Sequence, residues 1–246
     1  MDLSDTVVAR FLEGFHTAWE TVFFVQIGSN DGEHNDPLRP FILAGGWQGI
    51  MVEPVPYVFE RLTSNYGDRA GLNLVNTAVT DHDGVSDFYC LGESADPLPE
   101  WYDQLGSFTL ESMLDSWIQQ VIPDIRDRII TITVPCATFE SLCRRHGVGE
   151  IDLLHIDAEG HDYEIIRTID LQRRKPTVLL YEHKHLSRRD RLACRQLLAS
   201  EGYLTLDLSH DTLCLTRQAA ASSRLGLGRA WQDAVSAMRV AGWGTR

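Results

Sequence analysis

Positively charged residues are scarce in this chain of 246 residues. It has 22 Lys and Arg against 35 Asp and Glu, which gives a formal net charge of -13 at pH 7. Proteins that bind DNA or RNA gather Lys and Arg to neutralise phosphates, so we expect no nucleic-acid partner. The composition, 43% hydrophobic and 23% charged, is typical of one globular domain large enough to bury a sizeable core.

Long apolar runs are also missing. No segment approaches the roughly 20 apolar residues of a membrane span, and the N-terminus lacks a basic region followed by an apolar signal core. We therefore expect no membrane partner and a cytoplasmic location. The five cysteines are scattered and never form a C-x-x-C pair, which favours reduced core thiols and argues against a zinc site.

The common nucleotide motifs are absent, although one segment has the form of a ligand-binding turn. Residues 22–27 are mostly β-branched or aromatic and carry no charge, as in a strand buried on both faces, and they run into the sequence GSNDG. A dinucleotide fingerprint that starts at Gly28 would need glycine in place of Asn30 and Glu33, and no Walker-type lysine follows. The turn is therefore suited to a ligand other than a dinucleotide or a nucleoside triphosphate.

An acidic residue ends the next apolar run. Residues 49–53 read GIMVE, and a carboxylate at the tip of a second parallel strand is placed to accept the hydroxyl groups of an adenosine ribose. A ligand with adenosine but without phosphate needs no phosphate cradle, and S-adenosylmethionine fits that description. Glu53 is accordingly the candidate ribose ligand.

Strands and helices alternate along most of the chain. Strands are expected at 22–27, 49–53, 72–76, 129–134, 151–156 and 177–181, with helices between them, an irregular insertion at about 91–128 and a strand at 85–90. Two short strands around 203–208 and 212–216 are joined by a turn too short for a crossover helix, so they must pair antiparallel. The pattern predicts an α/β fold with a mostly parallel seven-stranded sheet, a terminal antiparallel hairpin and helices on both faces. Such a sheet resembles the Rossmann-like fold of S-adenosylmethionine-dependent methyltransferases.

The order of the motifs resembles the FkbM-type methyltransferase family from about residue 22 to 216. The resemblance is carried by VQIGSNDG (25–32), Asp36-Pro-Leu38, GIMVEPVPYVFERL (49–62), Asn76-Thr-Ala78, Cys136-x-Thr-Phe-x-Ser-Leu142, IDLLHIDAEGHDYEII (151–166), VLLYEHKHLS (178–187) and Asp211-Thr212. It implies O-methylation of a hydroxyl group on a small-molecule metabolite of the sugar or polyketide type. Residues 217–246 lie outside it, and Gln26 stands where many methyltransferases carry an acid. The expected division is a methyltransferase domain over residues 1–216 and a helical extension over residues 217–246.

The resemblance and the geometry of strand ends place the cofactor at the same residues. The turn after the first strand would hold the methionine end of S-adenosylmethionine, Glu53 the ribose, and the end of the third strand the adenine. The cofactor-binding candidates are Gln26, Gly28, Ser29, Asn30, Asp31, Gly32, Glu53, Pro54, Asn76, Thr77, Ala78 and Asp157.

Catalytic candidates follow two later strands at the same rim of the sheet. Methyl transfer to a hydroxyl needs either a general base or a divalent cation that polarises the hydroxyl. The arrangement is similar to that of macrocin-type sugar O-methyltransferases, which implies Glu159 as base and Mg2+ or Mn2+ held by Asp157, Glu182 and His183; the histidine favours manganese over magnesium. The catalytic candidates are Asp157, Glu159, His161, Glu182 and His183.

Several alternatives remain open from the sequence. His155 and His185 are expected to have structural roles. The aromatic, acidic insertion could cover the substrate or form its own small core, and the last residues could pack on the domain, cover the site or form a homodimer. Other classes of function are a metal-dependent hydrolase, suggested by H-x-D-x-E-x-H-D, and a relative that binds the cofactor without catalysis.

Overall fold

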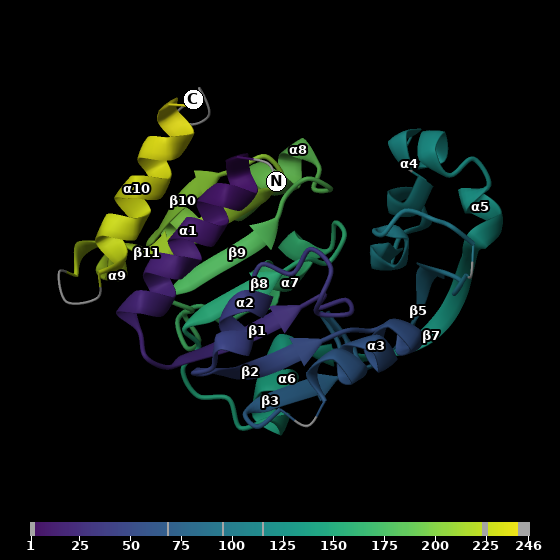
Figure 1. Cartoon of the computed structure of the whole chain (residues 1–246), viewed down its shortest axis with the longest axis horizontal. Helices are drawn as coiled ribbons and strands as arrows, with labels where there is room; N and C mark the ends of the chain where they lie inside the picture. The colour runs from purple at the N-terminus through teal and green to yellow at the C-terminus, as the bar shows by residue number, and fades with distance from the viewer. Residues whose placement is uncertain (1–2, 68, 95, 115, 223–225, 241–246) are drawn as a thin grey trace.

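The computed structural model describes residues 3–67, 69–94, 96–114, 116–222 and 226–240. Its centre is a seven-stranded sheet with the order β10-β11-β9-β8-β1-β2-β3 (Figure 1). The strands are β1 (Val22–Ile27), β2 (Trp47–Val52), β3 (Leu72–Val75), β8 (Leu153–Ile156), β9 (Val178–Glu182), β10 (Tyr203–Asp207) and β11 (Asp211–Thr216).

The direction of the strands confirms the expected fold. β1 pairs in parallel with β2 and β8, β2 with β3, and β8 with β9. β11 is antiparallel to both of its neighbours, β9 and β10, because the turn between β10 and β11 contains only a few residues. The structure is thus a Rossmann-like methyltransferase fold with a terminal hairpin.

Helices cover both faces of this sheet. One face packs against α1 (Leu3–Ala18), α2 (Arg39–Ala44), α3 (Pro56–Tyr66) and α10 (Leu227–Val240), and the other against α6 (Phe139–Arg145), α7 (Asp162–Thr168) and α8 (Arg188–Ser200). Successive residues of β1 divide between the two cores, Phe24 toward α1 and Val25 toward α6 and α7. This two-sided burial explains why β1 is apolar except at Gln26.

One expected strand belongs elsewhere. The segment 129–134, which continued the alternation in the sequence, is part of β7 (Ile129–Thr138) in a second sheet of order β4-β7-β5-β6. Its partners are β4 (Ala78–Thr80), β5 (Gly84–Leu91) and β6 (Gly106–Ser107). The periodicity of strands and helices does not show which sheet a strand joins. β7 belongs to the second sheet because it pairs with β5 along a long antiparallel ladder.

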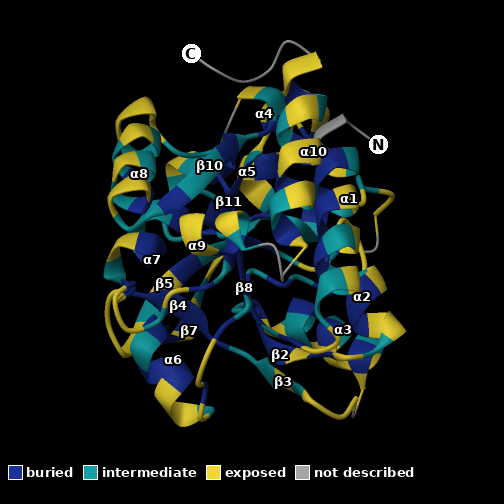
Figure 2. Cartoon of the chain, turned by 90° about the vertical axis from the view of Figure 1, so that its left-hand side faces the viewer, coloured by how far each residue is buried: buried dark blue, intermediate teal, exposed yellow. Residues whose placement is uncertain are grey.

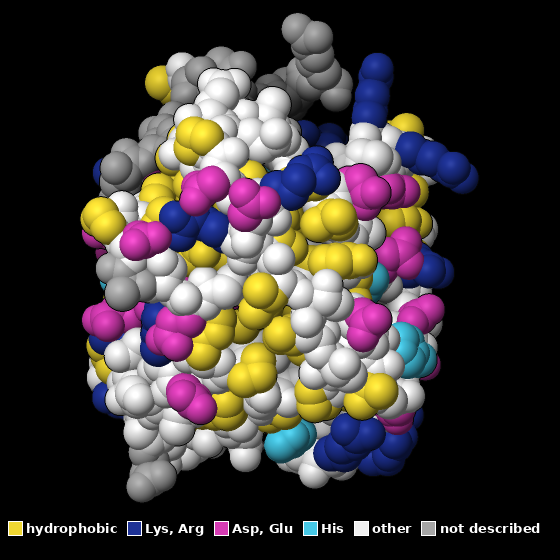
Figure 3. Space-filling model, turned by 90° about the vertical axis from the view of Figure 1, so that its right-hand side faces the viewer, with side chains coloured by type: hydrophobic (Ala, Val, Ile, Leu, Met, Phe, Trp, Pro, Cys, Tyr) yellow, Lys and Arg dark blue, Asp and Glu magenta, His cyan; other side chains and the backbone are white. Residues whose placement is uncertain are grey.

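The insertion has a small core of its own. It contains the 3-10 helices η1 (Tyr102–Gln104) and η2 (Leu110–Leu114) and the short helices α4 (Ser116–Val121) and α5 (Ile125–Arg128). Trp101 and Trp117 pack with ring centroids 5.0 Å apart beside buried side chains such as Met113 and Ile118. Figure 3 shows the face on the side of the insertion, where charged side chains of both signs surround a band of hydrophobic ones.

The C-terminal extension packs on the domain. After α9 (Arg217–Ala221), α10 runs beside α1 (Figure 2), and the rings of Phe11 and Trp231 meet edge to face at 6.4 Å. Trp231 and Met238 are part of the same core as β1 and β2. All five cysteines are buried and free. Among the described residues, no helix has the length and apolar character needed to cross a membrane.

Candidate functional site

The carboxyl ends of β1, β2 and β8 open into one cavity of about 910 Å3, including its open mouth. Parallel strands bring their ends to one rim of the sheet, and ligands of such sheets bind there. Most of the expected cofactor residues line this cavity. These are Gln26, Gly28, Ser29, Asn30, Glu53, Pro54, Thr77, Ala78 and Asp157.

The turn after β1 requires glycine at its first position. Gly28 has a φ of 76°, and a Cβ atom added there would lie 1.7 Å from the carbonyl oxygen of Asp157 at the end of β8. The backbone amides of Gly28 and Ser29 both donate to the carbonyl of Val52, at 3.0 and 2.9 Å. The turn is therefore clamped between the ends of β2 and β8 with its backbone at the cavity.

Glu53 is held by backbone donors from the loops after β1 and β2. Its Oε2 accepts a hydrogen bond from the amide of Asn30 at 3.0 Å, and its Oε1 accepts one from the amide of Val55 at 2.8 Å. Burial raises the pKa of Glu53 to about 7, although these two hydrogen bonds favour the ionised form. Each carboxyl oxygen has lone-pair capacity left for a ligand hydroxyl group.

Three of the residues expected to bind the cofactor hold the surrounding loops in place without lining the cavity. Asp31 Oδ1 accepts from the amides of Glu33 and His34, and its Oδ2 lies 2.6 Å from His34 Nδ1. Burial opposes the ionised form of Asp31, yet the bonds to His34 and to the two amides leave its pKa below the ordinary value. Asn76 Nδ2 donates to the carbonyls of Glu53 and Pro54, at 2.7 and 3.0 Å. Gly32, with a φ of 68°, packs against α3.

Asp36 supplies a carboxylate where Gln26 does not. Gln26 Nε2 donates to Asp36 Oδ1 at 3.0 Å, and both residues line the cavity. Burial raises the pKa of Asp36 to about 6, while the amide of Leu38 and the Gln26 side chain favour its ionised form. The segment Asp36-Pro-Leu38 was noted in the sequence, but the pairing of Asp36 with Gln26 depends on how the loop after β1 folds back.

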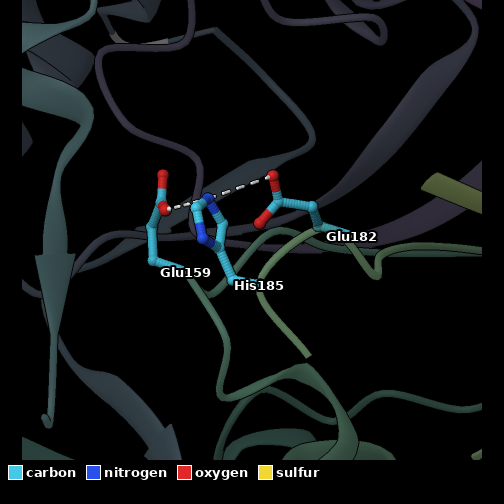
Figure 4. A group of neighbouring side chains, drawn as sticks. All are labelled: Glu159, Glu182 and His185. Carbon is cyan, nitrogen blue, oxygen red and sulfur yellow. Dashed lines mark ion pairs between the residues drawn. The ribbon is translucent and has the colours of Figure 1, made fainter. Parts of the chain in front are cut away.

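The ends of β8 and β9 bring several acids together. Asp157 and Glu159 line the cavity, and Glu159 has the unusual φ of 48°. Figure 4 shows Glu159, Glu182 and His185 facing one another. His185 Nε2 lies 3.2 Å from Glu159 Oε2 and 3.9 Å from Glu182 Oε1. The structure thus joins His185, which we expected to be structural, to two catalytic candidates.

His183 lies outside this group, so the expected metal set of Asp157, Glu182 and His183 is not assembled in this form. His183 is buried, and its Nδ1 lies 2.8 Å from Thr212 Oγ1 on β11. The possible metal ligands that the described residues bring within 4.8 Å of one another are Glu159, Glu182 and His185. The chain turns after β9, which directs residue 183 toward the hairpin and residue 185 back toward Glu159.

Burial dominates the electrostatics at this rim. It raises the pKa values of Asp157, Glu159 and Glu182, and the negative charge of Asp157 raises those of the two glutamates further. The positive charge of Lys184 opposes these shifts. Asp162 lies beneath the group, where its Oδ1 accepts from the amide of Glu182 at 3.2 Å. A bound cation would therefore stabilise the ionised forms of these acids.

The insertion forms one wall of the cavity. The sequence did not predict which residues of the insertion line it. The rings of Phe108 and His161 pack in a tilted arrangement with centroids 5.0 Å apart, and both residues line the cavity. Gln104 joins the wall to the loop after β1: Asn35 Nδ2 donates to its Oε1 at 3.1 Å, and its Nε2 donates to the carbonyl of His34 at 3.3 Å. No local sequence signal connects positions about 70 residues apart.

Several solved structures are similar to this chain. Among solved structures, the chain is similar to an FkbM methyltransferase from Methylobacillus flagellatus KT, with 14% identity, a TM-score of 0.49, and coverage of 80% of this chain and 44% of that one. It is also similar to a precorrin-6y C5,15-methyltransferase from Geobacter metallireducens GS-15 (10% identity, TM-score 0.39, coverage 85% and 86%) and to a fibrillarin pre-rRNA processing protein from Methanococcus jannaschii (7%, 0.41, 80% and 66%). The chain therefore spans less than half of the Methylobacillus protein.

No curated protein matches the chain in sequence. A family model described as the methyltransferase FkbM domain matches residues 26–205. This range includes the turn after β1, Glu53, the acids that follow β8 and Glu182 at the end of β9. The chain belongs to the FkbM methyltransferase family.

Proposed function

We propose that the chain is an S-adenosylmethionine-dependent O-methyltransferase that acts on a hydroxyl group of a small-molecule metabolite of the sugar or polyketide type. The observation that carries the proposal is the position of Glu53. Its carboxyl group is held by the amides of Asn30 and Val55, in a cavity that Asp157 and Glu159 also line. A ribose acceptor and a candidate base thus share one cavity.

The residues present fit an adenosyl cofactor. Glu53 can accept both ribose hydroxyls, and the turn 28–30 offers backbone for the methionine end. The buried Oε1 of Gln26 and Nδ1 of His155 have no hydrogen-bond partner among the described residues, and both side chains line the cavity. Such buried polar atoms are costly unless something binds them. S-adenosylmethionine would supply the activated methyl group.

The chain's own contribution to the chemistry is alignment and proton removal. In the proposed reaction, residues at the rim of the sheet would hold the acceptor oxygen in line with the methyl group that the cofactor would supply. The hydroxyl proton passes to the Glu159 carboxylate. A buried carboxylate with a raised pKa is a better base toward a weakly acidic hydroxyl than an exposed one.

The lining of the cavity disfavours an anionic acceptor. Within the described residues it includes Asp36, Glu53, Asp103, Asp157 and Glu159 but neither Lys nor Arg. Phosphate groups are usually bound by Arg, Lys or a helix N-terminus. The proposal therefore concerns hydroxyl groups on neutral or amino-bearing molecules rather than on phosphorylated ones.

Calorimetry with S-adenosylmethionine and S-adenosylhomocysteine tests the cofactor. The release of S-adenosylhomocysteine with neutral, amino-bearing and phosphorylated hydroxyl compounds then tests the reaction. We expect both cofactor forms to bind and product to form with the neutral or amino-bearing acceptors. No binding at millimolar cofactor would overturn the proposal, and binding without turnover on any acceptor would indicate a non-catalytic relative.

A further inference from the structure

We infer that Glu159, Glu182 and His185 form a binding site for a divalent first-row metal ion at the edge of the proposed cofactor cavity. One carboxyl oxygen from each glutamate and one ring nitrogen lie within 4.8 Å of one another. Ligands about 2.1 Å from one ion lie roughly 3 to 4 Å apart. A small rotation of the Glu182 side chain would bring all three ligand atoms within reach of one ion.

The second observation concerns Glu182 itself. The residue is 8% exposed, and its Oε2 is buried without a hydrogen-bond partner among the described residues. Figure 4 shows its carboxyl group directed toward His185 and Glu159. An unsatisfied buried carboxyl oxygen is costly, and a cation is the partner that satisfies it most strongly.

The nature of the ligands indicates which metal ion would bind. Two carboxylates and one imidazole suit Mn2+ and related ions, whereas Mg2+ prefers oxygen ligands alone. Three protein ligands leave positions for water or for an acceptor hydroxyl, as in catalytic rather than structural metal sites. Because Glu159 also lines the cavity, the ion would lie next to bound substrate, and with the ion bound Glu159 would act as a metal ligand rather than as the base.

One nearby cation competes with this arrangement. Lys184 favours the ionised forms of Asp157, Glu159 and Glu182 through its charge, while its Nζ lies 4.9 Å from the centre of the Trp117 ring. It balances part of the negative charge without entering the group of three. Its removal should therefore strengthen binding of a metal ion.

The test uses Mn2+ and the chelator-treated full chain, followed by electron paramagnetic resonance and calorimetry. We expect saturable binding of a single ion, weakened about tenfold or more in Glu182→Gln and in His185→Asn. Lys184→Met should tighten binding several-fold. Glu164→Gln, which changes a carboxylate paired with Arg167 on α7, is the matched control and should bind as the wild type does.

Absence of saturable binding at millimolar Mn2+ would overturn the inference, and so would wild-type affinity in both Glu182→Gln and His185→Asn. If Glu182→Gln fails to fold, His185→Asn decides alone, since His185 lies between β9 and α8. The inference rests on the proposed function only for its role in catalysis. Cofactor binding without Mn2+ binding refutes the metal site alone, whereas the reverse result refutes the proposed function.

Discussion

The amide of Asn30 donates a 3.0 Å hydrogen bond to Oε2 of Glu53 and thereby joins the ends of β1 and β2. The bond fixes the direction of the Glu53 carboxyl group toward the cavity before any ligand arrives. A site organised in this way loses little conformational entropy on binding.

Replacement of Glu53 should weaken binding of the cofactor. In Glu53→Ala, a charged acceptor for ribose hydroxyls is lost, and the amides of Asn30 and Val55 lose their partner. We expect binding of S-adenosylmethionine to weaken by about 1.5 to 3 kcal/mol, measured by calorimetry. Glu60→Ala, an exchange on α3 outside the cavity lining, is the control. Unchanged affinity in Glu53→Ala would remove this residue from the site.

A methyl group at position 28 should displace the turn. In Gly28→Ala, the new Cβ would meet the Asp157 carbonyl oxygen at 1.7 Å, and the φ of 76° disfavours any side chain. We expect cofactor affinity to fall at least about tenfold while circular dichroism still reports a folded protein. Gly149→Ala, where the added Cβ meets nothing within 4 Å, should bind normally. Equal affinity of the two variants would contradict the assignment of the turn.

Neutral substitutes for the two acids after β8 should slow turnover. Asp157→Asn and Glu159→Gln keep the side-chain shape but remove the charge beside the proposed acceptor. With the true acceptor, we expect either variant to reduce turnover by about 10² or more, the loss typical of a positioned base or metal ligand. Cofactor affinity should change less than in Glu53→Ala. Turnover within a few-fold of wild type in both variants would place the chemistry elsewhere.

The ligand-free protein should lose stability as the pH rises from about 5 toward 7. Burial raises the pKa of Glu53 from 4.5 to about 7, so in this range the folded chain keeps a proton that the unfolded chain releases. The contribution is fully present below pH 4.5 and is lost as the pH passes the folded pKa. Denaturant unfolding at several pH values measures the trend.

In Glu53→Gln, the dependence of the unfolding free energy on pH should be shallower, even if the variant is less stable overall. The slope is the informative quantity, because a glutamine amide also disturbs the hydrogen bonds from Asn30 and Val55. An identical slope in the two proteins would show that Glu53 does not retain its proton in this range.

Much of the fold and of the cofactor cavity could be predicted from local sequence patterns. β1 was visible because burial on both faces requires an apolar run, and Glu53 was identified because it follows the next strand directly. The short turn between β10 and β11 determined the antiparallel hairpin, since so few residues cannot form a crossover. These features depend on neighbours in the chain, and a sequence records neighbours directly.

Tertiary structure alone decided the partners of β7, the wall formed by Gln104 and Phe108, and the choice of His185 over His183. From the sequence we expected His183 to join the acids and His185 to be structural, and the structure reverses these two positions. His183 turns to Thr212 on β11, whereas His185 reaches Glu159. These contacts join residues far apart in the chain, and their geometry depends on how loops close across the rim of the sheet rather than on any local periodicity.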